Sequence, residues 1–161
     1  NCSTWGLTQQ DEKALNSFHK KQLREVIGVR WPHRIRNKNL YKQTKTKPIS
    51  IEVTRRRWNL FGHILRMPPD APARKAMKFF FETRCNKKYR GRKRATIHST
   101  IRHDIHKTKQ KFPNFAINEL KTEIDLHNIG SKARNRKHWT IITDQVVEAA
   151  YSDTASYDPA V

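Results

Sequence analysis

Three residues, Cys85, His98 and His103, have types and spacing that could bind zinc. Twelve residues separate Cys85 from His98 and four separate His98 from His103, which matches the second half of the zinc-finger pattern C-x2-4-C-x12-H-x3-5-H. Where the pattern needs a further cysteine the chain reads "FFE", and a fourth ligand would have to come from Glu82 or His106. Because closed zinc sites strongly favour four Cys and His ligands, we expect no metal site and no cofactor. We interpret the histidines as partly exposed helix residues beside phosphate-facing lysines.

The basic residues around Gly91 could instead bind phosphate. The chain between Asn86 and Lys111 holds ten Lys and Arg residues and one acid, Asp104. Each contact between such a side chain and a duplex phosphate releases a condensed counterion, so binding would be tight at low salt and would weaken steeply as salt rises. Tyr89 could stack on an unpaired base or be an ordinary exposed tyrosine. The run "KKYRGRKR" also fits a nuclear-import signal or a solvated loop.

Further basic residues occur earlier in the chain. One excess runs through Lys20, Lys21, Arg24, Arg30, Arg34, Arg36 and Lys38, and another is an arginine triplet at 55–57. We predict two groups of nucleic-acid-binding residues, which are Arg55, Arg56 and Arg57, and Lys87, Lys88, Tyr89, Arg90, Arg92, Lys93 and Arg94. Binding is favoured if the two groups share one face of the fold, and a structural role is favoured if they are scattered and ion-paired.

Acid and imidazole neighbours that could act in catalysis are few. Asp104 follows His103 and is close to His106, and Glu52 lies near His63, but helical spacing alone brings many such pairs together. The sequence has no nucleophile elbow, P-loop, dinucleotide fingerprint or pair of catalytic carboxylates. We therefore expect no catalytic residue and no enzyme activity of this segment alone.

Composition limits the partners and the size of the core. The chain has 161 residues, with 34 Lys and Arg against 14 Asp and Glu and a formal charge of +20, which favours a polyanionic partner. Hydrophobic residues make up 35% of the chain, so the core should be modest. No apolar run approaches the roughly 18 residues that a membrane span needs, and the two cysteines suggest no disulfide framework. The first methionine is Met67, so we expect a piece of a longer product.

The elements that would position these residues are predicted to be helices. The clearest one opens with Thr8 and Asp11, which have capping-box spacing, and stops at Gly28. Its apolar stripe consists of Leu15, Phe18, Gln22 or Leu23, and Val26. The stretch "VRWPHRIRN" is predicted to be a connector because a proline disfavours helix in the residue before it. A short helix should follow from about Asn37 to Lys45.

A second strong helix is predicted after Pro48. Its apolar residues on one side are Val53, Leu60, Phe61 and Ile64, with Trp58 and Leu65 beside them. We expect Trp58 and Phe61 to supply buried area, and Gly62 to let another helix approach.

Apolar spacing predicts four more helices toward the C-terminus. "RKAMKFFFE" should form a short one, and isoleucines at 97, 101 and 105 predict another, which Pro113 ends. "NFAINELKTEIDLHNIG" and "SKARNRKHWTIITDQVVEAAY" are the last two, the second of them capped by Ser131 with Trp139, Ile142 and Val146 facing inward. The predicted fold is mainly α, a small bundle of about five to seven helices with a basic loop. We expect one basic α-helical module at residues 1–151, with a subdivision near 84–95 left open, and a disordered tail at 152–161.

Four stretches resemble a known family. They are "FHKKQLREVIGVRWPHRIRNKNLY", "RRRWNLFGHILRMP", "RGRKRATIHSTIRHDI" and "ARNRKHWTIIT", and they occur in the order and rough spacing seen at the C-terminal end of LINE-type (non-LTR) retrotransposon polyproteins, downstream of the reverse transcriptase core. The resemblance covers roughly residues 5–143. "RWPHRIRN" is similar to the family's tryptophan-containing stretch leading to Ile-x-Asn, and "RRRWNLFGHILRM" to its Arg-rich Gly-His-x-x-Arg-Met signature. Lys93 stands where the family usually has proline, and Ile97 where tryptophan is common, which suggests a diverged or decayed copy.

The resemblance implies a thumb-like or post-thumb helical module that holds template RNA, the primer duplex or target DNA. In the parent polyproteins an endonuclease nicks target DNA and a reverse transcriptase copies element RNA; neither the transcriptase's metal-binding aspartate pair nor the endonuclease residues can be located in this chain. The implied partners are the RNA or DNA backbone and the upstream transcriptase core, and the implied location is a nuclear or cytoplasmic ribonucleoprotein. The alternative is a structural or protein-interaction helical domain from a decayed or domesticated retroelement fragment.

Overall fold

The computed structural model describes residues 2–83 and 95–155, with the backbone alone at 82, 83 and 152–155. Within these ranges the chain forms seven α-helices and one short 3-10 turn, η1 (Cys2–Thr4), and no strand. The predicted mainly α fold is therefore confirmed. The basic loop expected around Gly91 lies outside the described residues, so its prediction stays a prediction.

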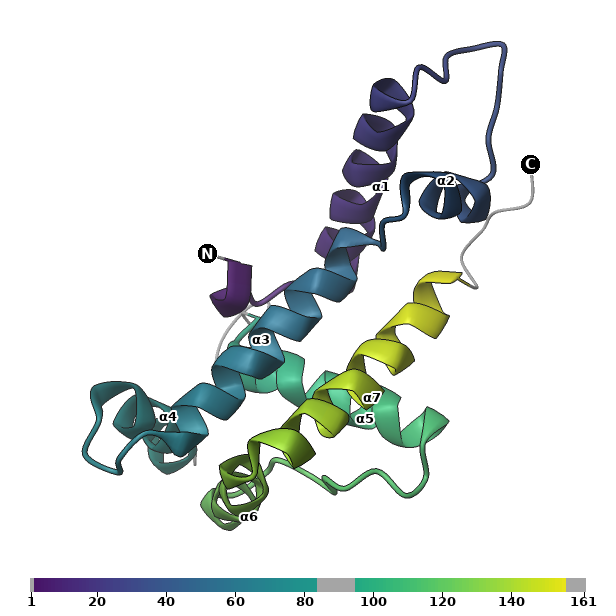
Figure 1. The fold of residues 1–161 in the computed structure, drawn as a ribbon. Coiled ribbons are helices and arrows are strands. Elements are labelled where there is room, and N and C mark those ends of the chain that lie inside the picture. Colours follow the sequence, from purple (N-terminus) through teal and green to yellow (C-terminus); the bar gives the residue numbers. More distant parts are fainter. Residues whose placement is uncertain (1, 84–94, 156–161) are drawn as a thin grey trace.

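Two antiparallel helices form the centre of the fold (Figure 1). They are α3 (Ile49–Arg66) and α7 (Arg136–Ala155), and α5 (Ile97–Lys111) packs across them. Near one end of α3 lie α4 (Pro72–Thr83) and α6 (Glu123–Arg134), and near the other lie α1 (Gln9–Val26) and α2 (Asn37–Thr44). A helix of the length of α3 spans ~27 Å at 1.5 Å per residue, so the two ends of the bundle are well separated.

The core is built around the aromatic residues that the sequence predicted to be buried. Trp58 and Phe61 are fully buried on α3, and Trp139 on α7 packs against both, with ring centroids 5.7 and 6.0 Å away. The indole Nε1 of Trp139 donates a hydrogen bond of 3.2 Å to the backbone carbonyl of Trp58. A Cβ atom at Gly62 would lie 2.2 Å from that same nitrogen. The expected role of Gly62, which is to let another helix approach, is therefore confirmed.

The ends of α1 follow the local sequence signals. Its N-terminus has the predicted capping box, in which the Thr8 amide donates to Asp11 Oδ2 at 2.9 Å and the Asp11 amide donates to Thr8 Oγ1 at 3.3 Å. Past its C-terminus, after the C-cap residue Ile27, stands Gly28, which has a φ of 72°. The amides of Gly28 and Val29 donate to the carbonyls of Glu25 and Arg24, the pattern of a Schellman motif.

The apolar stripe predicted on α1 is only partly covered by the fold. Phe18 and Val26 are 62% and 81% exposed, and no residue of α1 is fully buried. Leu15 and Leu23 are half-buried. The helix therefore lies at the margin of the bundle and does not belong to its core.

The junction between the last two helices differs from the prediction. Ser131 was expected to cap the final helix, but it lies inside α6, where its hydroxyl donates to the carbonyl of Asn128 at 2.7 Å. The two helices are separated instead by Asn135, whose side-chain oxygen accepts a hydrogen bond of 3.1 Å from the His138 amide. Asn135 is thus the cap of α7. The three residues predicted to face inward on α7, Trp139, Ile142 and Val146, are buried.

Two further expectations about boundaries were wrong. The segment at 114–122 is not helical, and α6 begins only after Thr122, which forms a capping box with Asp125. At the C-terminus α7 continues to Ala155, so residues 152–155 belong to a helix where a disordered tail was expected. Residues 156–161 lie outside the described part of the chain.

Candidate nucleic-acid interface

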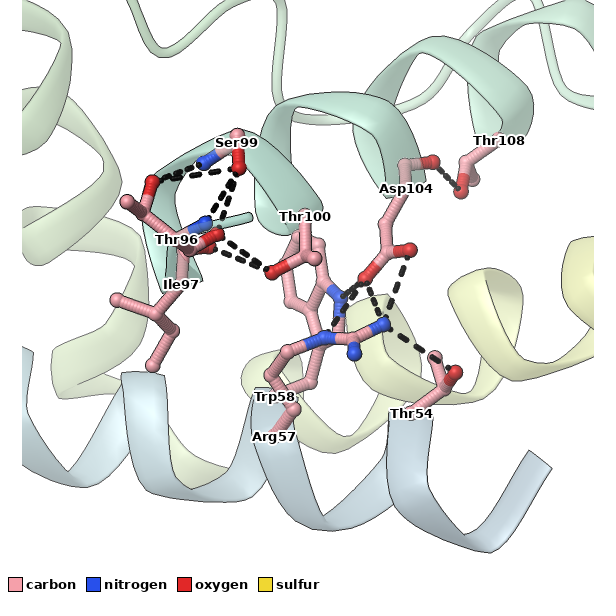
Figure 2. Close-up of polar contacts among 9 residues, drawn as sticks. All are labelled: Thr54, Arg57, Trp58, Thr96, Ile97, Ser99, Thr100, Asp104 and Thr108. Atoms are coloured by element: carbon pink, nitrogen blue, oxygen red, sulfur yellow. Dashed lines mark hydrogen bonds and ion pairs between the residues drawn. The ribbon is translucent and has the colours of Figure 1, made fainter. Parts of the chain in front are cut away.

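Arg57, one of the predicted phosphate-binding residues, lies in the core (Figure 2). Its Nη2 atom lies 3.0 Å from Oδ2 of Asp104 on α5, and its Nε atom donates to the same oxygen at 3.3 Å. Trp58 Nε1 donates to this carboxylate as well, at 2.8 Å. A side chain that is 1% exposed cannot reach a phosphate on the surface, so Arg57 does not contribute to an interface in this structure.

The other two arginines of the triplet are on the surface, but each has an acidic partner. Arg55 Nη1 lies 2.8 Å from Oδ1 of Asp144 and ties α3 to α7. Arg56 Nε lies 2.7 Å from Oε1 of Glu52, one turn earlier on α3. Exposed pairs of this kind are worth ~0–1 kcal/mol, so a phosphate could replace the carboxylates, but the triplet is not a patch of unneutralised charge.

The second predicted group lies outside the described residues. It consists of Lys87, Lys88, Tyr89, Arg90, Arg92, Lys93 and Arg94. Whether the two predicted groups share one face is therefore not settled, and the second group stays a prediction.

The segment from Val26 to Ile51 is strongly basic and contains no acidic residue. Its seven Lys and Arg residues are Arg30, Arg34, Arg36, Lys38, Lys42, Lys45 and Lys47. All seven basic side chains are exposed. We call this set the connector–α2 surface. Within the described ranges none of the seven forms an ion pair.

An open groove of about 630 Å³ lies where α1 meets this surface. Its lining residues are Ser17, Lys20, Lys21, Arg24, Glu25, Val29, Arg30 and Asn37. Arg24 links α1 to the other side of the groove, because its Nη2 atom donates to Oδ1 of Asn37 at 2.7 Å and to the carbonyl of Ile35 at 3.4 Å. The four basic side chains face a single acid, Glu25, so the groove is cationic.

A second basic cluster lies at the α6–α7 junction, near the opposite end of α3. Arg66 and Arg74 donate to the carbonyls of Ala133 and Leu65. Burial lowers the pKa of both guanidinium groups, and the nearby charge of Arg136 lowers that of Arg66 further; Arg134 has the same effect on Arg74. We call Arg66, Arg74, Arg134 and Arg136 the junction cluster.

The signal for the connector–α2 surface was present in the sequence but was given less weight than the longer run around Gly91. The excess from Lys20 to Lys38 was visible, whereas Lys42, Lys45 and Lys47 were not counted with it. The signal was the absence of any acid between Glu25 and Glu52. The junction cluster had no comparable signal, because Arg66 and Arg74 join it only through the fold.

The residues considered for metal binding do not form a site in the part of the chain that is described. His98 is buried, stacked on Phe80 at 3.6 Å between ring centroids, with Nε2 3.3 Å from the Met77 carbonyl oxygen. His103 is exposed on the same helix, and Cys85 lies outside the described residues. Over residues 2–83 and 95–155, no group of three or more His, Cys, Asp or Glu side chains is arranged to hold a metal ion.

The acid and imidazole neighbours are arranged for structure. Asp104 accepts hydrogen bonds from Arg57 and Trp58, and Glu52 pairs with Arg56. The cavity beside Asp104 and His103 measures about 20 Å³, far below the ~300–1,000 Å³ of small-molecule sites. Among the helices in the described ranges, none is long and apolar enough to cross a membrane.

No family model matches the chain, and neither the curated proteins nor the solved structures contain a match.

Proposed function

We propose that this chain is a nucleic-acid-binding helical module of the kind found at the C-terminal end of non-LTR retrotransposon reverse transcriptases. It holds template RNA, primer duplex or target DNA through contacts with phosphates, next to an upstream transcriptase core, and performs no catalytic step of its own. This proposal joins the family resemblance to the charge of the described surface, and it places the module in a nuclear or cytoplasmic ribonucleoprotein.

The connector–α2 surface is the observation that carries the proposal. Seven exposed basic side chains lie between Val26 and Ile51, and no acidic residue of that segment is there to neutralise them. A polymer with one negative charge every 3.4 Å along each strand neutralises several of them at once and releases its own counterions. A small anion could not span such a surface.

The junction cluster gives independent support. Arg136 and Lys137 lie at the N-terminus of α7, a helix whose first turn holds no acid, where the helix dipole already disfavours cations. Like charges kept at an unfavourable place lower the stability of the free protein, and such sites often have a binding role. Exposed arginines at a helix N-terminus would suit a phosphate.

The second candidate function is a structural or protein-interaction domain from a decayed or domesticated retroelement. Its support is that Arg55 and Arg56 are ion-paired and Arg57 is buried, as a structural role predicts. Large apolar side chains are also exposed, among them Phe18, Val26 and Ile124 at 62%, 81% and 72%. Such side chains could pack against another protein domain.

A binding assay with charge-matched variants distinguishes the two candidates. Single-stranded RNA, an RNA–DNA hybrid and duplex DNA, each labelled, are titrated with the purified chain across a salt series. One variant replaces Lys38, Lys42 and Lys47 of the connector–α2 surface with Gln. The control replaces Lys75, Lys78 and Lys121, which are exposed elsewhere, so both variants lose the same formal charge.

The proposal expects saturable binding that the first variant weakens at least about tenfold more than the control at low salt. The slope of log K against log salt is negative, and each lost phosphate contact should reduce its magnitude by ~0.9 on duplex and ~0.7 on single strands. Polyglutamate of matched charge should compete poorly. Absence of binding by a folded sample, or equal effects of the two variants, would leave the structural candidate in place.

A further inference from the structure

Trp31 is the most exposed large apolar side chain of the connector. It is 83% exposed, although tryptophan is highly buried on average in folded proteins. It stands at the tip of a turn closed by a 2.9 Å hydrogen bond from the His33 amide to the Arg30 carbonyl. The turn projects from the bundle between α1 and α2 (Figure 1). The two faces of the indole ring are therefore open to a partner.

The surroundings of Trp31 are cationic. Arg30, its neighbour in the chain, lines the groove beside α1, and Arg34 and Arg36 follow on the same connector, both exposed. An apolar partner for the indole would have to approach through these charges. A ligand that combines a flat ring with negative charge would instead match both features.

The groove continues this pattern along α1. Lys20, Lys21 and Arg30 line it together with Arg24, which is held by Asn37 and the carbonyl of Ile35. Gly28, with a φ of 72°, lies where the chain passes from α1 into the connector that carries Arg30. The lining thus contains one arginine fixed by hydrogen bonds and three further basic residues.

We propose that the groove and Trp31 form a binding site for a single-stranded nucleic acid, with phosphates along Lys20, Lys21 and Arg30 and an unpaired base stacked on Trp31. The proposal rests on the nucleic-acid-binding function and specifies the form that is bound here. Aromatic side chains beside a basic groove bind single strands because an unpaired base exposes its π-face. A base within a duplex is already stacked on both sides, so duplex binding would not use Trp31.

The test compares single strands with duplex in four forms of the full chain. The ligands are a 12-nucleotide oligouridylate, the corresponding oligothymidylate and a 12-base-pair DNA duplex, sizes chosen within the roughly 4–16 nucleotides typical of single-strand sites. The forms are the original chain, Trp31→Ala, Trp31→Phe and Trp5→Ala. Trp5 is the matched control because it is the other exposed tryptophan, at 47%. Circular dichroism checks that each form is folded.

Trp31→Ala should weaken binding to both single strands by roughly 5- to 140-fold, the range that base stacking supplies, and change duplex binding less than about twofold. Trp31→Phe should keep most of the affinity, and Trp5→Ala all of it. In a Trp5→Phe background Trp31 is the only exposed tryptophan, since Trp58 and Trp139 are buried, and the oligonucleotides should quench its fluorescence.

Three results would overturn the proposal. Equal losses on single strand and duplex would show that Trp31 does not stack on a base, and unchanged affinity of Trp31→Ala would remove the site while leaving phosphate binding elsewhere intact. If a folded sample binds none of the three ligands, the broader nucleic-acid-binding function is overturned as well. The first two outcomes therefore reject this site alone, and the third rejects both proposals.

Discussion

Arg57 on α3 and Asp104 on α5 form an ion pair in the core, with 3.0 Å between Nη2 and Oδ2. The carboxylate also accepts the indole hydrogen of Trp58 at 2.8 Å. In a chain of charge +20, one of the scarce acids is thus used to neutralise an interior arginine. The pair joins two helices that are distant in sequence.

Removal of Asp104 should strongly destabilise the fold. Asp104→Ala leaves a buried guanidinium without its counter-charge, and breaking one half of a buried pair typically lowers the free energy of unfolding by about 3–5 kcal/mol. The control is Asp144→Ala, which removes the acidic partner of the exposed Arg55. This change should lower the free energy of unfolding by no more than ~1 kcal/mol. Urea unfolding of both variants measures the difference. A loss below ~1 kcal/mol for Asp104→Ala would show that the core tolerates the unpaired arginine.

Gly62→Ala should destabilise the contact between α3 and α7. The new Cβ would overlap the indole of Trp139, whose Nε1 would lie 2.2 Å away, and the indole is fixed by Trp58 and Phe61. Overpacking of this kind costs about 1–3 kcal/mol. Gly130→Ala is the control, because the nearest atom there is Arg74 Nη2 at 3.2 Å, the end of a flexible side chain. Its thermal midpoint should stay near that of the original chain, whereas that of Gly62→Ala should fall by several degrees.

Local signals predicted the parts of the fold that local hydrogen bonds determine. The capping box of Thr8 and Asp11 and the stop at Gly28 depend on residues within one or two turns, so the sequence contains them in full. The pair Thr122 and Asp125 has the same capping-box spacing in the sequence and marks the true start of α6. Ser131 was chosen as a cap because serine favours that position, but a hydroxyl inside a helix can bond to an earlier carbonyl instead.

Other features required the tertiary structure. Which part of the α1 stripe is covered depends on where α2 and α3 lie, so the exposure of Phe18 could not be read from spacing alone. The spacing of Arg57, four residues after Val53 and four before Phe61, already placed it on the apolar side of the predicted helix. Its counter-charge Asp104 lies 47 residues away, and that partner could not be read from the sequence. The candidate interface is therefore the connector and not the arginine triplet. The absence of acidic residues in the connector was visible in the sequence.

Acid should weaken the contact between α1 and α2 through His19. Burial lowers the pKa of this imidazole below its ordinary value of 6.5, and its ring lies 6.0 Å from that of Tyr41. A lowered pKa means that the folded state binds fewer protons, so the contribution of His19 is complete above about pH 6.5 and is lost as pH falls through the folded pKa. His19→Gln should make the urea midpoint less sensitive to pH between about 7.5 and 5.5, whereas His127→Gln, an exposed control, should not.

Arg136→Gln should stabilise the free protein and weaken its binding to nucleic acid. Arg136 begins α7, where the helix dipole disfavours a cation, and its charge lowers the pKa of Arg66 after the effect of burial, the direction expected for two guanidinium groups that repel each other. Removal of the Arg136 charge should relieve both the unfavourable dipole interaction and this repulsion. The free energy of unfolding should therefore rise by about 0.5–1 kcal/mol at low ionic strength. In about 1 M salt, where the screening length is ~3 Å, most of this gain should vanish.

Arg134→Gln separates the dipole from the like-charge effect. Arg134 lies in the last turn of α6, where a cation is favourable, although its charge also lowers the pKa of Arg74. The two effects oppose each other, so the free energy of unfolding of the Arg134→Gln variant should differ from that of the original chain by less than about 0.5 kcal/mol. If both variants lose affinity for duplex DNA while only Arg136→Gln gains stability, the junction cluster keeps its charge for binding at the expense of the fold. If Arg136→Gln gains stability without loss of affinity, the repulsion serves no phosphate contact, and the connector–α2 surface alone must account for binding.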